Sequence, residues 1–207
     1  MFITFEGPEG SGKSTQLPRL AQFLEDSSLQ VVKTREPGGT KIGDQIREVL
    51  VRMDNTELHP RTEILLFLAA RAQLVEELII PSLKQGKIIL CDRYGDSTLA
   101  YQGYGHGLDL ETLRAMLQFA TGGLKPDLTI LLDVDVFTGL KRKKIKEEWN
   151  RLDAFELSFH ERVRAGYKIL AEQEPERWKI VDATQDPDQV QMEIRALVLD
   201  AIDNKRI

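Results

Sequence analysis

The chain has 207 residues, of which 42% are hydrophobic and 29% are charged, a composition typical of a globular protein with one sizeable core. Its formal net charge of −5 argues against nucleic acid or an anionic membrane as the main partner. Because the N-terminus is not signal-like and Cys91 is the single cysteine, we expect one cytoplasmic domain over residues 1–207.

Five short apolar runs are expected to form strands, and segments with helical periodicity separate them. The runs lie near Phe2–Phe5, Gln30–Lys33, Lys87–Cys91, Leu128–Leu132 and Lys179–Val181. Their near-continuous apolarity and their alternation with helices are typical of a parallel sheet covered on both faces. We therefore predict an α/β fold, a three-layer sandwich around a five-stranded parallel sheet. Ligands in such folds bind beyond the carboxyl ends of the strands, so the loops after the first four strands should build the site.

A glycine-rich loop follows the first predicted strand and precedes a helical stretch from Thr15 to Leu24. It has the pattern G-x-x-x-x-G-K-S and consists of Gly7, Pro8, Glu9, Gly10, Ser11, Gly12, Lys13 and Ser14. Between a strand and a helix, this pattern cradles phosphate groups on backbone N–H groups. An ordinary turn is the alternative interpretation. We expect Lys13 to reach the β- and γ-phosphates of a nucleoside triphosphate and Ser14 to bind its Mg²⁺.

Polar residues also follow the second and third predicted strands. Asp92 lies where a carboxylate commonly holds Mg²⁺ in phosphate-loop enzymes, although it could instead cap the next helix. Arg93 could grip a second phosphate group through two hydrogen bonds, or it could form a structural ion pair. The Pro37-Gly38-Gly39 segment suits the close approach of a small ligand, and it would also suit a plain connecting turn.

The stretch from Pro60 to Ile80 is expected to form one long helix. Its predicted buried stripe consists of Ile64, Leu65, Leu68, Ala72, Val75 and Leu78. Phe67 and Arg71 are four residues apart and share a face, where the ring could stack on a planar base and the guanidinium could donate to its oxygens. On spacing alone, a core phenylalanine beside a surface arginine is the favoured interpretation.

These motifs occur together in one known family. The phosphate loop is followed by Arg35-Glu36-Pro37-Gly38-Gly39-Thr40, Leu66-Phe67 through Arg71, Asp92-Arg93-Tyr94 and Ser97 through Gly103. With these motifs in this order, the chain resembles bacterial thymidylate kinase over essentially its whole length. The resemblance implies the fold of a P-loop nucleoside monophosphate kinase, transfer of the γ-phosphoryl group of ATP to dTMP, a requirement for Mg²⁺ and a homodimer.

The resemblance also implies roles for individual residues. The implied contacts to dTMP are Glu9, Glu36, Pro37, Phe67, Arg71, Arg93, Ser97, Thr98, Tyr101 and Gln102. The implied contacts to ATP are Gly7, Pro8, Glu9, Gly10, Ser11, Gly12, Lys13, Ser14, Thr15 and Arg142. Phe67 would stack under thymine, Tyr101 would lie against the deoxyribose, and Arg93 would clamp the acceptor phosphate. Glu9 would lie near the acceptor sugar, where a hydroxyl partner would explain its negative charge.

Residues 141–152 correspond to a mobile lid over ATP in this family, although such a basic run could also be a solvated helix face. Gly10 stands where another branch of the family has arginine. The resemblance therefore places the catalytic arginine in the lid, and Arg151 is our candidate for it. Asp153 and Glu156 are three residues apart, so we expect them to share one helix face. The resemblance implies that they approach the substrate or its Mg²⁺; a salt-bridge face with His160 and Arg164 is the alternative.

The implied reaction needs alignment and charge neutralisation more than proton removal, because the acceptor is already an anionic phosphate oxygen. Lys13, Arg93 and Arg151, together with Mg²⁺, would hold donor and acceptor in line. Two other functions are compatible with the phosphate loop: a kinase for another nucleoside monophosphate or small metabolite, and a nucleotide-dependent switch. The absence of an N-K-x-D motif argues against a guanine-reading switch.

Overall fold

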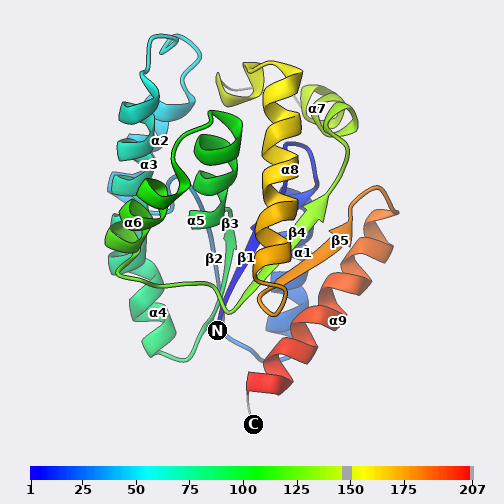
Figure 1. The fold of residues 1–207 in the computed structure, drawn as a ribbon. Helices are drawn as coiled ribbons and strands as arrows, with labels where there is room; N and C mark the ends of the chain where they lie inside the picture. Colours follow the sequence, from blue (N-terminus) through cyan, green and yellow to red (C-terminus); the bar gives the residue numbers. More distant parts are fainter. Residues whose placement is uncertain (146–150, 206–207) are drawn as a thin grey trace.

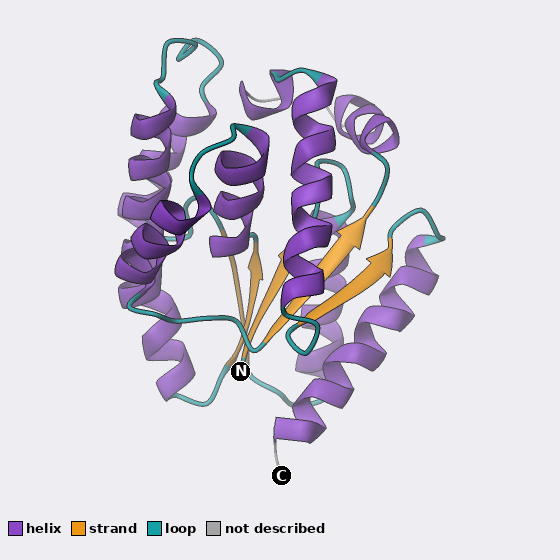
Figure 2. Cartoon of the chain, in the orientation of Figure 1, coloured by secondary structure: helices purple, strands orange, loops and turns teal. Residues whose placement is uncertain are grey.

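A computed structural model describes residues 1–145 and 151–205, and a five-stranded sheet lies at its centre (Figures 1 and 2). The strands are β1 (Phe2–Glu6), β2 (Val31–Arg35), β3 (Ile88–Asp92), β4 (Leu128–Asp133) and β5 (Trp178–Asp182). They are parallel and lie in the order β2-β3-β1-β4-β5. The prediction of an α/β fold with a five-stranded parallel sheet is confirmed, and each strand lies within two residues of a predicted apolar run.

Helices connect the strands and cover both faces of the sheet, as the purple and orange ribbons of Figure 2 show. The α-helices are α1 (Lys13–Asp26), α2 (Lys41–Val51), α3 (Pro60–Leu74), α4 (Ile80–Lys84), α5 (Gly95–Thr98), α6 (Leu110–Thr121), α7 (Val136–Ile145), α8 (Leu157–Gln173) and α9 (Pro187–Lys205). Two π-helical segments, η1 (Val75–Ile79) and η2 (Leu99–Gly105), and a 3-10 turn, η3 (Arg151–Ala154), complete the described elements.

Alternate residues of β1 face opposite sides of the sheet, as a strand requires. Ile3 and Phe5 are fully buried in the hydrophobic core that α1 and α9 share with the sheet. Phe2 packs on the other side, where its ring contacts Tyr94 edge-on with centroids 4.9 Å apart. By the same parity, Glu6 at the end of β1 faces the side covered by α5 and α8. A buried carboxylate therefore lies immediately before the phosphate loop.

The predicted helix from Pro60 to Ile80 begins as expected, but η1 interrupts it before α4 begins at Ile80. Ile64, Leu68 and Val75 of the predicted stripe are buried, whereas the prediction for Leu65 is wrong because 58% of its surface is exposed. Glu63 and Arg71 take the inward positions instead, and both are buried. The inward face of α3 is therefore polar where it borders the site.

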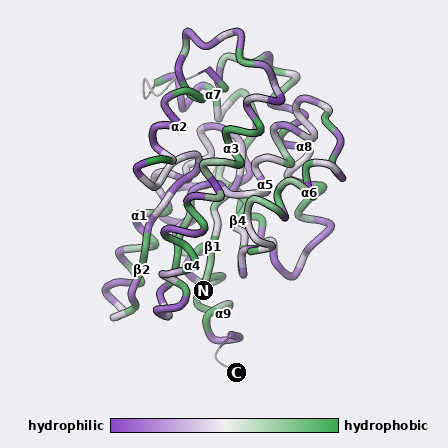
Figure 3. Tube along the Cα trace, turned by 90° about the vertical axis from the view of Figure 1, so that its left-hand side faces the viewer, coloured by the Kyte–Doolittle hydropathy of each residue, from purple (hydrophilic) through white to green (hydrophobic). Residues whose placement is uncertain are grey.

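Hydrophilic residues predominate in the connection between α2 and α3, which projects from the end of the molecule at the top of Figure 3. This end also carries the carboxyl ends of the strands, whereas the N-terminus and the end of α9 lie at the opposite end (Figure 1). Among the described residues, none of the helices has the length and apolarity needed to cross a lipid bilayer. The short connections between strands and helices thus gather the candidate site residues at one edge of the sheet.

Candidate functional site

A cavity of about 720 Å³ opens at the carboxyl ends of the strands. The expected site residues that line it are Glu9, Gly10, Ser11, Gly12, Lys13, Ser14, Thr15, Glu36, Pro37, Phe67, Arg71, Asp92, Arg93, Ser97, Thr98, Tyr101, Gln102 and Arg142. All of the expected residues belong to the described part of the chain. Three of them, Gly7, Pro8 and Arg151, do not line the cavity. Residues from segments far apart in the sequence therefore share one continuous space.

The loops that build the cavity differ in part from the prediction. The loops after β1, β2 and β3 contribute as expected. The loop after β4 does not, because Asp133 is turned to Arg164 and Lys168 and pairs with both. Instead, the segment after β5 supplies part of the wall, through Ala183, Gln185, Pro187 and Val190. The cavity thus extends from the phosphate loop toward the start of α9.

The phosphate loop turns through glycines in the left-handed region, with φ values of 67° at Gly10 and 99° at Gly12. Gly12 is the N-cap of α1 and has no side chain to cap the helix, which leaves N–H groups of the first turn for an anion. A β-carbon at Gly12 would meet no atom within 4 Å. The loop therefore leaves room for a ligand against its backbone.

Lys13 lies across the loop instead of extending into solvent. Its ammonium donates to the carbonyl oxygens of Gly7 and Pro8, both at 3.0 Å, and to the hydroxyl of Ser11 at 3.2 Å. Burial and the nearby Arg93 lower the pKa of Lys13 to about 8. A phosphate group in the cavity would restore the preference for the charged amine, so the site is electrostatically suited to an anion.

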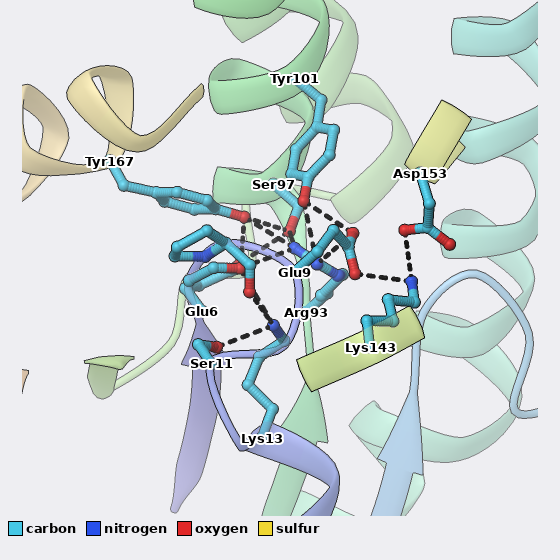
Figure 4. A network of polar contacts seen from close by, with 12 residues as sticks. Glu6, Glu9, Ser11, Lys13, Arg93, Ser97, Tyr101, Lys143, Asp153 and Tyr167 are labelled. Atoms are coloured by element: carbon cyan, nitrogen blue, oxygen red, sulfur yellow. Dashed lines mark hydrogen bonds and ion pairs between the residues drawn. The ribbon is translucent and has the colours of Figure 1, made fainter. Parts of the chain in front are cut away.

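Arg93 occupies the centre of the polar network in Figure 4. One end of its guanidinium donates to Glu9 Oε1 at 2.7 Å and to the Tyr101 hydroxyl at 3.0 Å. The other end donates to Gly7 O at 3.2 Å and to the Tyr167 hydroxyl at 3.0 Å. Its backbone has a φ of 68°, a strained conformation for a residue with a side chain. The network over-determines this conformation and fixes the guanidinium at the cavity wall.

Glu9 is held by cations and by a hydroxyl group. Besides Arg93, its Oε1 accepts from the Tyr101 hydroxyl at 2.8 Å, and its Oε2 accepts from Lys143 at 2.8 Å. Burial disfavours the charged carboxylate, but Arg93, Lys143 and Lys13 outweigh burial and lower the pKa of Glu9. The negative charge in the phosphate loop is thus neutralised by basic neighbours, two of which come from distant parts of the chain.

Glu6 is a site residue that the sequence analysis missed. It is fully buried and accepts hydrogen bonds from the Tyr94 N–H at 2.8 Å, the Ser97 hydroxyl at 2.6 Å and the Tyr167 hydroxyl at 2.9 Å. Burial raises its pKa to about 7, and Asp96 adds to the rise. A glutamate at the end of an apolar strand, directly before a phosphate loop, was a signal that could have identified it.

Arg71 is buried, so the interpretation of a surface arginine is wrong. Its Nε donates to Glu36 Oε2 at 2.7 Å, and its terminal nitrogens donate to the Thr98 hydroxyl at 2.9 Å and to Tyr94 O at 3.1 Å. Phe67, one turn earlier on α3, also lines the cavity. The aromatic ring and the fixed guanidinium together border a pocket suited to a flat, polar ring.

Arg151 lies away from the cavity. Its guanidinium forms a buried ion pair with Glu63 Oε2 and donates to Leu50 O at 3.1 Å. The other oxygen of Glu63 accepts from the Gln102 amide at 2.8 Å. In this structure, the expected catalytic arginine therefore contacts the partner of a cavity residue instead of the phosphate loop, and no local sequence signal connects these residues.

Asp92 is suited to a metal ion. It lines the cavity, and its Oδ1 is a buried oxygen that has no hydrogen-bond partner among the described residues. Ser14 lines the same cavity. The described part of the chain has no group of three or more His, Cys, Asp or Glu side chains that could hold a metal alone. One carboxylate and one hydroxyl, completed by phosphate oxygens and water, are a ligand set that Mg²⁺ accepts.

The predicted lid over residues 141–152 lies partly outside the described residues, which exclude 146–150. Within the described part, Arg142 lines the cavity and donates to Ala183 O at 3.0 Å, and Lys143 contacts both Glu9 and Asp153. The backbone of α7 touches the phosphate loop, since a β-carbon at Gly10 would lie 1.9 Å from Gly139 O. An arginine at Gly10 would require α7 to move.

Asp153 and Glu156 do not share a helix face. Asp153 is buried in η3, and its carboxylate pairs with Lys143 at 2.5 Å. Glu156 is exposed and is the N-cap residue of α8. The boundary between η3 and α8 separates them, so the expectation of one shared face is wrong. Asp153 contributes to the site through Lys143, as Figure 4 shows.

The geometry combines two kinds of binding surface. One end of the cavity has a glycine-rich loop with Lys13, and the other has Phe67, Arg71 and Gln102. Arg93 lies between them, with its guanidinium on Gly7 O of the loop and on the Tyr101 hydroxyl. Such a site can hold two anionic ligands end to end and can stabilise negative charge where they meet.

The chain is similar to known proteins in both sequence and structure. Residues 5–194 match the family profile described as "Thymidylate kinase". The thymidylate kinase of Roseiflexus castenholzii is 53% identical over 211 residues, covering 96% of this chain and 92% of the relative. That of Desulfovibrio desulfuricans is 49% identical, covering 96% and 94%. The crystal structure of thymidylate kinase from Ehrlichia chaffeensis superposes with a TM-score of 0.79 at 35% identity, covering 96% of this chain and 98% of that structure.

Proposed function

The chain belongs to the thymidylate kinase family, and we propose that the cavity at the carboxyl edge of its sheet is where it binds its two substrates. It is an ATP-dependent nucleoside monophosphate kinase that phosphorylates dTMP. The observation that carries the proposal is the continuity of the cavity, which joins the phosphate loop to the pocket at Phe67. A kinase for a different acceptor is not favoured.

ATP would bind at the phosphate loop. The loop from Gly7 to Thr15 would receive the phosphates on its free backbone N–H groups, although Pro8 has none and Thr15 N already donates to Gly12 O. Lys13 would turn from the loop carbonyls to the phosphates. Arg142 would contact the nucleoside, which is supported by its place beside Ala183 in the cavity wall. The lowered pKa of Lys13 supports this role, because it reflects a buried cation that lacks an anionic ligand.

The acceptor dTMP would bind at the other end. Phe67 would stack on thymine, and Arg71 and Gln102 would hydrogen-bond to the base edge. Thr98 would support the base through Arg71, to which its hydroxyl is bonded. Tyr101 would lie against the deoxyribose. The remaining proposed contacts of this end are Glu9, Glu36, Pro37 and Ser97, all of which line the cavity.

Arg93 would bind the acceptor phosphate, and the backbone strain and dense hydrogen bonding at this residue support that role. Because that phosphate is already anionic, no general base is required. Lys13 and Arg93 would draw donor and acceptor into line, and water would be excluded when the lid closes. Ser14 and Asp92 would hold Mg²⁺, which offsets the charge of the phosphates when it is bound.

Arg151 remains our candidate for the catalytic arginine of the lid. To reach the transferred group, Arg151 would have to leave Glu63 and Leu50 O. We also propose that residues 1–207 form a single kinase domain in the cytoplasm and that two copies form a homodimer. Exposed Leu65 on α3 and Phe119 on the adjacent α6, which are 58% and 91% exposed, support a covered face there.

An acceptor panel tests the proposed placement of dTMP. Purified protein with ATP and Mg²⁺ would be assayed with dTMP, dUMP, UMP, CMP and shikimate, and the products would be identified. We expect dTMP to be the preferred acceptor. Phe67→Ala should raise KM for dTMP about tenfold, since loss of a base stack typically costs about 1–3 kcal/mol, and should change KM for ATP little. A variant that raised KM for ATP instead would contradict the placement.

A further inference from the structure

Glu63 is a buried carboxylate that joins the base pocket to the lid. It lies in the first turn of α3, and only 2% of its surface is exposed. Its carboxylate does not line the cavity, but Gln102 does. The side chain therefore acts on a ligand only through its neighbours.

The described neighbours of Glu63 present hydrogen-bond donors. Gln102 Nε2 donates to Oε1 at 2.8 Å, and the Arg151 guanidinium donates to Oε2. His106 Nε2 lies 3.9 Å from Oε1. An arginine has donors and no acceptors, whereas an ionised carboxylate has acceptors and no donors. The ion pair with Arg151 thus requires an acceptor at Glu63, and the same carboxylate requires a donor from Gln102.

This requirement decides how the Gln102 amide is turned. A carboxamide has its nitrogen and oxygen at opposite ends of a planar group, so an amide that gives its nitrogen to Glu63 turns its oxygen elsewhere. Gln102 is 2% exposed and borders the cavity, so its amide has two main orientations, which differ by a half-turn that exchanges nitrogen and oxygen. The amide oxygen is the end left for a base.

We propose that Glu63 is a specificity-positioning residue, which turns the oxygen of Gln102 toward the base so that it accepts the N3–H of thymine. The inference rests on the proposed placement of dTMP beside Phe67 and Gln102. A base with a lone pair at N3 would place two acceptors against each other in a dry pocket. When a ligand leaves a buried polar group of the site without a hydrogen-bond partner, its affinity is typically lower by about tenfold or more.

The variant Glu63→Gln tests which way the hydrogen bonds from Arg151 and Gln102 to residue 63 run. It keeps the shape of the side chain and replaces one acceptor oxygen by a donor nitrogen. Arg151 would still require the amide oxygen of the new glutamine. The new amide nitrogen would then face Gln102, and two NH₂ groups cannot satisfy each other. Gln102 is expected to turn, so that its nitrogen faces the base and tolerates an N3 lone pair.

The assay compares dTMP with the 5-methyl-2-pyrimidinone 2′-deoxynucleotide. This analogue has a lone pair at N3 and hydrogen in place of the oxygen at C4. Loss of the C4 contact is common to both proteins, so a difference between their ratios reports on N3. The two dissociation constants are measured without ATP, so that Arg151 stays on residue 63. We expect the wild-type protein to prefer dTMP, and Glu63→Gln to lower the ratio of the two affinities about tenfold. Because the ratio does not depend on the fraction of folded enzyme, partial unfolding would not imitate this result. Glu76→Gln, an exposed substitution in the adjoining η1, is the matched control and should leave the ratio unchanged.

Gln102→Leu separates this inference from the proposed substrate placement. Removing the amide should itself lower the ratio, and adding Glu63→Gln to Gln102→Leu should then change it no further. If Gln102→Leu leaves the ratio unchanged, thymine does not lie at Gln102 and the placement is wrong. If Gln102→Leu lowers the ratio but Glu63→Gln does not, the placement stands and the role of Glu63 is refuted.

Discussion

Glu6 offers a quantitative test of the electrostatics beneath the phosphate loop. The substitution Glu6→Gln keeps the shape of a fully buried side chain and removes its charge. Its neighbours can accept the change: the amide oxygen would accept from the Tyr94 N–H, and the amide nitrogen would donate to the hydroxyls of Ser97 and Tyr167, which can act as acceptors. The variant should therefore fold.

The expected change in the free energy of unfolding follows from the pKa of Glu6, which burial and Asp96 raise from 4.5 to about 7. Between these values the unfolded chain has lost the proton and the folded chain retains it. The folded state therefore binds more protons at Glu6, and the contribution of Glu6 to the free energy of unfolding must fall as pH rises. That fall is about 3 kcal/mol over the whole interval, at about 1.4 kcal/mol for each pH unit. The substituted glutamine cannot ionise and makes no such contribution.

Urea denaturation of both proteins from about pH 5 to about pH 8 measures this difference, because the other titrating groups are shared and most of their contributions cancel. The wild-type protein should lose about 2–3 kcal/mol relative to Glu6→Gln across this range. If the two free energies of unfolding run parallel with pH, Glu6 has an ordinary pKa and the electrostatic reasoning is refuted.

Three further results are expected. Arg151→Ala should lower kcat about a thousandfold while KM for dTMP changes far less; unchanged turnover would show that another cation acts on the transferred group. Because burial and Arg93 lower the pKa of Lys13 to about 8, ATP affinity should decline above that pH, and calorimetry in two buffers at about pH 9 should detect proton uptake on ATP binding. No proton uptake would contradict a contact between Lys13 and phosphate. Gly139→Ala places a β-carbon 2.2 Å from Glu9 O, so it should displace α7, cost about 1–3 kcal/mol of stability and raise KM for ATP. An unchanged melting temperature and KM would show that α7 does not rest on the loop.

Much of the fold and one half of the site could be predicted from local sequence patterns. The strands coincide with runs of apolar residues, because each central strand is buried on both faces. The phosphate loop could be recognised because phosphate binding requires particular residues at fixed spacing within eight consecutive positions, Gly7 to Ser14. Asp92 and Arg93 could be placed at the same edge because β3 ends there, beside β1.

The features that were missed depend on contacts between distant segments. Leu65 was placed in the core because apolar residues usually face inward, but on α3 the inward face borders the site and carries Glu63 and Arg71. Arg151 and Glu63 are 88 positions apart, and their ion pair leaves no pattern in either segment. The position of Glu6 before the phosphate loop is a local signal, but its hydrogen bonds come from Tyr167 in α8 and Ser97 in α5, and no local pattern shows them.

The central claim is that ATP and dTMP meet end to end in one cavity, with Arg93 between the phosphate loop and the base pocket. Inhibition by a bisubstrate compound, adenosine linked to thymidine through a polyphosphate chain, tests it most directly. We expect the compound to compete with both ATP and dTMP, and its affinity to fall when Lys13 or Phe67 is replaced. Competition with only one substrate would show that the two ends of the cavity do not serve the same reaction.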